Sequence, residues 1–96
     1  MRFPLLLCLL LAGCAGTTDP DTIQRRGAVE LAVKSDPDAI LRDIVAGGGP
    51  VLTAAMDSAR IPDSDRPARV LQMQRDLGLY EVNPGALVVA LMTYGN

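Results

Sequence analysis

The residue best placed to do chemistry in this sequence is Cys14, which follows the small residues Ala12 and Gly13 at the end of an apolar run. A cysteine acts as a nucleophile through its thiolate, so its sulfur is a candidate for covalent modification. The two residues before it carry almost no side chain, so another protein can approach the backbone closely there. The residue types therefore suit a site at which an enzyme modifies the chain.

An N-terminal leader precedes this cysteine. Arg2 is followed by an apolar run from Phe3 to Leu11, and the run ends in small residues. This is the layout of a secretory signal peptide. The run is shorter than the roughly 20 apolar residues that a membrane-spanning helix needs. We therefore expect the leader to direct export and to be removed.

The segment Leu11-Ala12-Gly13-Cys14 resembles the lipobox of bacterial lipoproteins, and the resemblance covers residues 1–14 only. In that family the cysteine sulfur receives a diacylglyceryl group, the chain is cut just before the cysteine, and the new amine is usually acylated. The resemblance implies that Cys14 carries diacylglycerol and an N-acyl chain such as palmitate. It also implies that Leu11, Ala12 and Gly13 are recognised by the signal peptidase, which removes residues 1–13. An ordinary signal peptide with a nearby cysteine is the alternative.

The resemblance also bears on location. One acyl chain binds a membrane only marginally, whereas two or more anchor a protein stably. In lipoproteins of this kind an Asp directly after the cysteine is associated with retention in the inner membrane, and here that residue is Ala15. The resemblance therefore implies the periplasmic face of the outer membrane, with the inner membrane as the alternative.

Composition limits what the rest of the chain can do. The sequence has no histidine, and its two cysteines are Cys8 in the leader and Cys14. A mature chain with a lipidated Cys14 thus has no Cys/His zinc site, no Ser-His-Asp triad and no thiol nucleophile. Of nine basic residues only Arg2 lies in the leader, and all eleven acidic residues follow it, so the mature formal charge is −3. This charge argues against nucleic-acid binding, and we expect neither an enzyme nor a metal or cofactor site.

Residues 14–19 form the lipidated cysteine and a short tether, and residues 20–96 form one small domain. The five residues from Ala15 to Asp19 reach at most about 17 Å. Prolines at positions 20, 37, 50, 67 and 84 each precede a helix-compatible stretch, and proline favours the first turn of a helix. The sequence therefore predicts an all-α fold, a small bundle of four to five short helices.

Apolar residues at helical spacing predict one face for each helix. The first helix, capped by Asp19, has Ile23, Gly27 and Leu31 on one face with Ala28 and Ala32. The other faces are Ile40, Leu41, Ile44 and Val45 in the second helix, Val51, Leu52, Ala55, Met56 and Ala59 in the third, and Val70, Leu71, Gln74 and Leu77 in the fourth, which Gly78 ends.

The last segment, residues 84–94, is apolar on all sides. Residues 79–94 could instead form a hairpin around Asn83-Pro84-Gly85, which would give an α+β fold. Asn83 as N-cap, with Val82 packed on Leu87 as a hydrophobic staple, favours a helix. Such a helix either fills the core or presents part of its surface to a partner, and the candidate contact residues are Leu87, Val88, Leu91 and Met92.

Two loops have the composition of ligand sites but lack essential residues. Gly47-Gly48-Gly49-Pro50 could cradle an anion, yet no lysine or serine stands at phosphate-loop spacing. Asp63-Ser64-Asp65 begins like a calcium loop but continues with Pro67 and Gln74 where ligands are needed. We interpret the first as a helix stop with a hinge and the second as a capping loop.

The sequence thus predicts a membrane-anchored periplasmic lipoprotein. We expect a non-enzymatic accessory or interaction module of an envelope assembly, such as a secretion, conjugation or outer-membrane maintenance complex, with a protein partner and no nucleic acid. The alternative is a module that binds an apolar ligand or lipid.

Overall fold

The computed structural model describes residues 19–95, and in this range the chain forms six α-helices and one 3₁₀ turn. They are α2 (Pro20–Lys34), α3 (Pro37–Ala46), α4 (Pro50–Ala59), η1 (Asp63–Asp65), α5 (Arg66–Arg75), α6 (Leu77–Val82) and α7 (Pro84–Tyr94). No strand occurs in residues 19–95. The all-α prediction is confirmed, and the hairpin alternative for residues 79–94 is wrong.

The helices begin where the prolines predict. Pro20, Pro37, Pro50 and Pro84 are the first residues of α2, α3, α4 and α7. A proline disfavours the helical conformation in the residue before it, which keeps that residue outside the helix. Three of these residues cap the following helix. Side-chain oxygens of Asp19, Asp36 and Asn83 accept hydrogen bonds from the amides of Asp21, Ala39 and Ala86 at 3.2, 3.1 and 3.3 Å.

The helix α6 was not predicted. The chain leaves α5 at Asp76 and resumes a helix at once, so Gly78 lies inside α6 rather than ending α5. Asn83 then ends α6 because the following proline holds it in an extended conformation, at φ −144° and ψ 84°. The predicted hydrophobic staple is absent, since Val82 is 82% exposed while Leu87 is buried.

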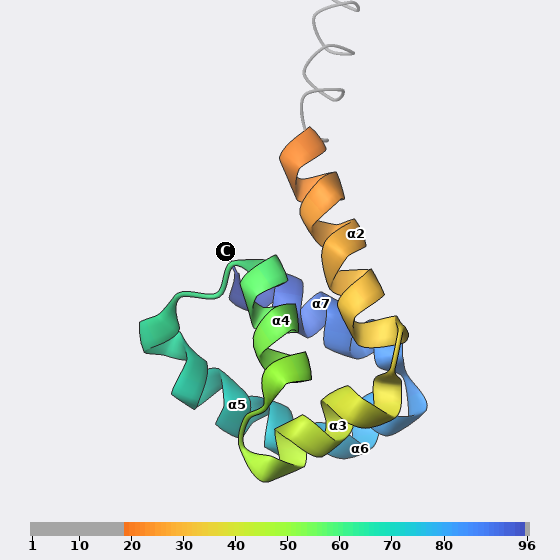
Figure 1. Cartoon of the computed structure of the whole chain (residues 1–96), viewed down its shortest axis with the longest axis vertical. Helices are drawn as coiled ribbons and strands as arrows, with labels where there is room; N and C mark the ends of the chain where they lie inside the picture. Colours follow the sequence, from red (N-terminus) through yellow and green to blue (C-terminus); the bar gives the residue numbers. More distant parts are fainter. Residues whose placement is uncertain (1–18, 96) are drawn as a thin grey trace, which may run out of the picture.

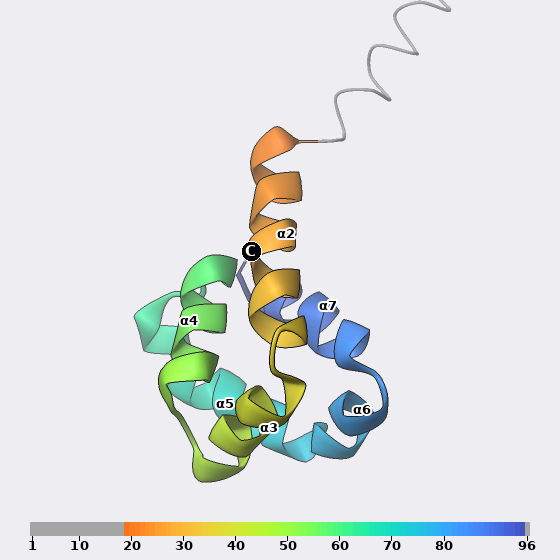
Figure 2. The same ribbon diagram turned by 45° about the vertical axis from the view of Figure 1, so that its right-hand side comes forward.

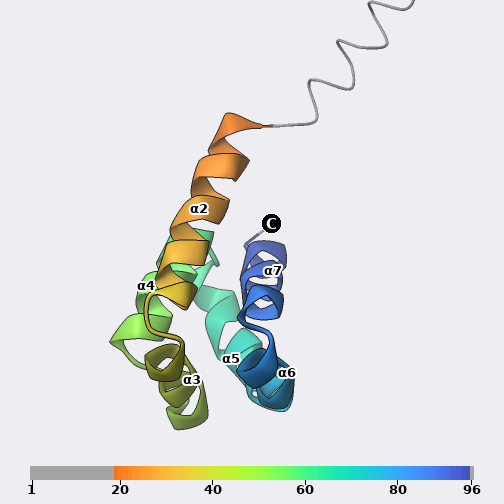
Figure 3. The same ribbon diagram turned by 90° about the vertical axis from the view of Figure 1, so that its right-hand side faces the viewer.

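The helices form two layers (Figure 3), with α2, α3 and α4 on one side and α5, α6 and α7 on the other. α7 packs against α2 and α4, while α3 packs against α5 and α6. Figures 1 and 2 show that the N-terminal half of α2 extends beyond the other helices. The core between the layers consists of Val29, Val33, Ile40, Ile44, Leu52, Ala55, Met56, Ala59, Ile61, Val70, Met73, Tyr80, Leu87, Val88, Leu91 and Met92.

Most of the predicted apolar face of α2 does not point into this core, and of its residues Ala32 packs against it. Val29 and Val33 are the buried residues of the helix, whereas Ile23 and Leu31 are 58% and 70% exposed. Apolar residues occur on both sides of α2, so periodicity alone could not choose between the sides. Contact with α4 and α7 selects the side that carries the valines.

The turn between α3 and α4 is closed by backbone and side-chain hydrogen bonds. Gly47 is left-handed at φ 85°, which favours glycine, and the amides of Gly47 and Gly48 donate to the carbonyls of Ile44 and Asp43 at 3.1 and 2.9 Å. These bonds form a Schellman motif. The predicted helix stop at Gly47 is therefore confirmed.

Within residues 19–95, no single helix has the length and apolar character needed to cross a membrane. The pair α3 and α4 meets both criteria only when taken together, and its two helices are bent by 99° relative to each other.

Candidate functional site

The predicted lipidation site and its recognition segment, Cys14 with Leu11, Ala12 and Gly13, lie outside residues 19–95. Lipidation therefore stays a prediction. The described chain begins at Asp19, which caps α2, so only the four residues 15–18 separate Cys14 from the first capped helix.

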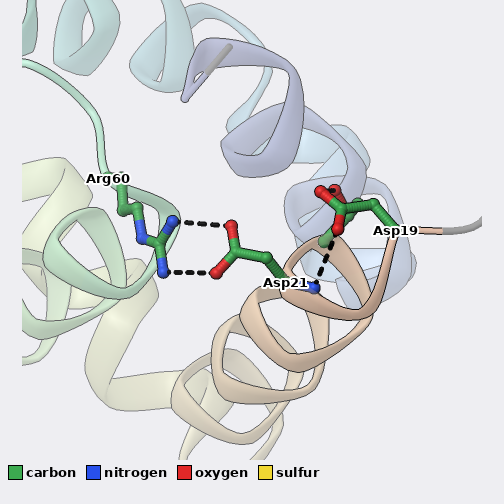
Figure 4. Close-up of polar contacts among 4 residues, drawn as sticks. Asp19, Asp21 and Arg60 are labelled. Atoms are coloured by element: carbon green, nitrogen blue, oxygen red, sulfur yellow. Dashed lines mark hydrogen bonds and ion pairs between the residues drawn. The ribbon is translucent and has the colours of Figure 1, made fainter.

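An ion pair fastens that first turn to the end of α4 (Figure 4). The guanidinium of Arg60 donates two hydrogen bonds to the carboxylate of Asp21, with Nη1–Oδ2 and Nη2–Oδ1 distances of 2.7 and 2.8 Å. Beside it, the carboxylate of Asp19 accepts hydrogen bonds from the Asp21 amide at 3.2 Å and from the Thr22 hydroxyl at 3.3 Å. Two acidic residues thus perform separate tasks, since one caps α2 and the other joins it to α4.

The geometry of this ion pair has electrostatic and conformational consequences. The hydrogen bonds from Arg60 lower the pKa of the Asp21 carboxyl, and Asp21 in turn raises the pKa of the guanidinium. Arg60 itself is left-handed at φ 61°, the only such non-glycine residue in the described chain. Both side chains are more than half exposed, so the pair is a surface clasp rather than a buried site.

The candidate partner-contact residues of α7 are buried. Leu87, Val88 and Leu91 are at most 1% exposed and Met92 is 8% exposed. They belong to the core shared by the two layers. Their burial agrees with the core role that the sequence also allowed, and it leaves these four side chains almost no surface for a partner.

An open apolar groove of about 460 Å³ lies between α3 and α6. Its apolar lining is Leu41, Val45 and Leu77, and charged residues flank it. Val45, predicted as part of the inward face of α3, is 62% exposed here. The groove is open to solvent, and it is framed by the acidic residues Asp38 and Glu81 together with the basic residue Arg42.

The glycine loop before α4 is filled by a side chain of the protein itself. The Asp43 carboxylate accepts hydrogen bonds from the amides of Val51 and Leu52 at 2.9 and 3.0 Å. A Cβ atom on Gly49 would lie 2.3 Å from this carboxylate. The N-terminus of α4 already holds an intramolecular anion, which disfavours binding of an external one. We expected a hinge here, but the loop is a turn held by the hydrogen bonds between Asp43 and α4.

The acidic loop before α5 likewise has a structural role. Arg66 donates through Nε to the carbonyl of Ile61 at 3.0 Å, and its Nη1 lies 2.8 Å from Oδ1 of Asp57. Asp63 joins this cluster at 3.4 Å. Within residues 19–95, no group of three or more His, Cys, Asp or Glu side chains is arranged to hold a metal ion.

The two tyrosines lie where α5, α6 and α7 meet. Tyr80 is 3% exposed, and burial together with the nearby Tyr94 raises the pKa of its hydroxyl above the ordinary value of 10.0. The guanidinium carbon of Arg69 lies 4.6 Å from the centre of the Tyr94 ring, which is a cation–π contact. The tyrosines thus help hold the second layer together.

Sequence reasoning missed three side chains that fasten distant elements. Arg60 bonds to Asp21, and Asp43 caps α4 across the glycine loop. The side-chain amide of Gln74 donates to the carbonyl of Ile44 at 3.0 Å and so joins α5 to α3. Of the three, only Asp43 has a pattern in the sequence that could have revealed its role, because its carboxylate stands shortly before a glycine run that leads into a helix.

Comparisons of this chain with protein-family models, with curated proteins and with solved structures find no match. The argument for function therefore rests on the chain's own residues.

Proposed function

We propose that this chain is a lipid-anchored lipoprotein of the bacterial envelope whose helical domain is a non-enzymatic accessory module of an envelope assembly. The observation that carries the proposal is the segment Leu11-Ala12-Gly13-Cys14 at the end of an apolar leader. The proposed location is the periplasmic face of the outer membrane, because Ala15 rather than an aspartate follows Cys14.

The junction between tether and domain supports this proposal. A tether of five residues reaches at most about 17 Å, so an anchored domain would stay close to the lipid surface. If the tether transmits a pull from the membrane, the Asp19 cap and the Asp21–Arg60 ion pair would keep the first turn of α2 folded and joined to α4. A domain positioned in this way presents its other surfaces to proteins of the same membrane.

Binding of an apolar ligand or lipid is the second candidate function. The groove between α3 and α6 favours it, because Leu41, Val45 and Leu77 offer apolar surface in a space of about 460 Å³. Mass spectrometry of extracts from the purified protein tests this function. A stoichiometric lipid that is lost in Val45→Asp, but kept in Thr53→Asp on exposed α4 surface, supports ligand binding.

Metabolic labelling with an alkyne fatty acid, followed by membrane fractionation, tests the anchor. We expect label and outer-membrane sedimentation for the parent chain, and neither label nor processing for Cys14→Ser. Cys8→Ser is the matched control, because it removes the other cysteine of the same leader and should be labelled normally. Label retained in Cys14→Ser would contradict the proposal.

The proposed membrane and the accessory role are tested separately. Ala15→Asp should move the labelled protein to the inner membrane, whereas Ala15→Ser should leave it in place. Crosslinking in intact cells should then give an adduct with another envelope protein that is lost in Cys14→Ser. A chain that remains monomeric and free of adducts would overturn the accessory role without affecting the anchor.

A further inference from the structure

The face of α2 that points away from the core carries an unpartnered apolar stripe. Ile23, Gly27 and Leu31 recur every four residues, which places them along one side of the helix. Ile23 and Leu31 are 58% and 70% exposed, and apart from the adjacent residues and the backbone of α2 itself no atom lies within 4 Å of where a Cβ on Gly27 would be. The core-facing residues Val29 and Val33 lie on the opposite side.

Charged residues follow one edge of this stripe. By helical position, Arg26, Glu30 and Lys34 share that edge, with the lysine at its end, and the acidic cap Asp19 stands just before its first turn. Nε of Arg26 lies 3.4 Å from Oε1 of Glu30, and both side chains remain about half exposed. The edge therefore follows a negative charge, has a mixed centre and ends with a positive charge.

We propose that a second copy of this chain covers the stripe, with the two α2 helices antiparallel and crossing at Gly27. A two-fold axis at Gly27 exchanges positions equally distant from it along the helix. Ile23 and Leu31 are each four residues away, about 6 Å along the axis. Ile23 of one copy then packs beside Leu31 of the second copy, and the absence of a side chain at Gly27 lets the helices approach closely.

Charge complementarity selects the antiparallel arrangement. Lys34 lies about 10 Å beyond Gly27 and Asp19 about 12 Å before it. Antiparallel pairing therefore places Lys34 of one copy beside Asp19 of the second, and Glu30 beside Arg26. Parallel pairing, with the two-fold axis along the helices, would set the charged edges of the two copies on opposite sides of the contact, so these charges would not meet. Opposite charges therefore meet only in the antiparallel arrangement.

The size of this contact predicts a weak dimer. Two crossed helices about 22 Å long bury less than the roughly 1,200 Å² of a standard stable interface. Such a dimer forms at high local concentration, which anchoring to a common surface would supply if the proposed function holds. The pairing itself depends only on the surface of α2 and not on the anchor.

Disulfide trapping in intact cells tests the arrangement. Differently tagged chains carrying Ile23→Cys and Leu31→Cys are co-expressed and oxidised, and a mixed dimer is expected. Either variant alone should crosslink poorly, since its two cysteines would be about 12 Å apart along the axis and a disulfide requires Cα atoms within about 7 Å. Gly27→Cys alone should crosslink with itself.

Two controls fix the background. The parent chain reports any crosslinking through Cys8 or Cys14, and Leu71→Cys reports random collision at an apolar α5 residue that is 59% exposed. Adding Leu31→Glu to Gly27→Cys should reduce the dimer by about tenfold or more, because it buries an unpaired charge against Ile23 of the second copy. Circular dichroism of this double variant checks that it is folded.

Two results would overturn the proposal. Self-crosslinking of Ile23→Cys that exceeds the mixed pair would indicate parallel helices. Trapping of all α2 variants at or below the level of Leu71→Cys would show that no second copy covers this face. Neither result would change the labelling of Cys14, so the dimer and the anchor fail independently.

Discussion

Replacing Asp43 with alanine should destabilise the domain more than any other single change at a surface carboxylate. The side chain accepts hydrogen bonds from Val51 and Leu52, whose amides have no acceptor within the first turn of α4. Leu52 is fully buried, so water replaces the carboxylate poorly. The alanine variant leaves both donors without their acceptor.

The expected magnitude follows from these two losses. Loss of a helix cap costs about 1 kcal/mol, and leaving a partly buried donor unsatisfied costs about 1 kcal/mol more. The free energy of unfolding should therefore fall by about 2 kcal/mol. For a domain of this size each kcal/mol shifts the melting temperature by about 4–8 °C, so Asp43→Ala should melt roughly 8–16 °C lower.

Thermal unfolding of the lipidated chain in detergent, followed by far-ultraviolet circular dichroism, measures this effect. The control is Asp65→Ala, because Asp65 stands at the N-cap of α5 without a side-chain hydrogen bond and should cost less than about 0.5 kcal/mol. A melting temperature for Asp43→Ala equal to that of Asp65→Ala would refute the reasoning.

A double-mutant cycle sharpens this test. Gly49→Ala places a Cβ 2.3 Å from the Asp43 carboxylate, which should cost about 1–3 kcal/mol. Once Asp43 is alanine the obstacle is gone, so the same Gly49→Ala change should cost less than about 0.5 kcal/mol. Strictly additive effects would show that the carboxylate does not occupy this position.

Three further outcomes follow from the structure. Arg60 holds the pKa of Asp21 below 3.8, so the difference in stability between the parent chain and Asp21→Asn should be present at neutral pH and should shrink as the pH falls below that value. Urea unfolding at several pH values measures this difference. A difference that is unchanged in acid would contradict the ion pair with Arg60. The pKa of Tyr80 in the folded chain is raised from 10.0, so the unfolded chain loses this proton at a lower pH and the stability of the domain should fall as the pH rises above 10.0. Tyr80→Phe should reduce that fall, which alkaline unfolding followed by absorbance measures. A pH dependence that is unchanged in Tyr80→Phe would contradict the burial of this hydroxyl. Gly27→Ala, inside α2 with open space around its Cβ, should raise the free energy of unfolding by about 0.5–1 kcal/mol, and a lower melting temperature would show that the position is constrained.

The local features of the fold could be predicted from the sequence because they depend on neighbouring residues. The proline-marked helix starts and the Asp19 and Asn83 caps each involve contacts within three residues. The fully apolar segment 84–94 was correctly favoured as a helix for the same reason. The predicted contact between Val82 and Leu87 was wrong because Val82 is exposed at the end of α6, a helix that the sequence did not predict.

The tertiary features could not be predicted because they depend on which helix faces meet. Both sides of α2 carry apolar residues, and only contact with α4 and α7 selects Val29 over Ile23. The ion pair between Asp21 and Arg60 joins residues 39 positions apart, and no local pattern marks it. The chemistry expected at Cys14 depends on a leader that an export pathway would recognise, so the folded domain does not bear on it.

The intact mass of the protein extracted from membranes tests the central claim most directly. We predict a chain that begins at Cys14 and carries the added mass of a diacylglyceryl group and an N-acyl chain, with Cys8→Ser giving the same mature mass. A chain that begins at Met1, or one cut elsewhere and free of lipid, would contradict the account.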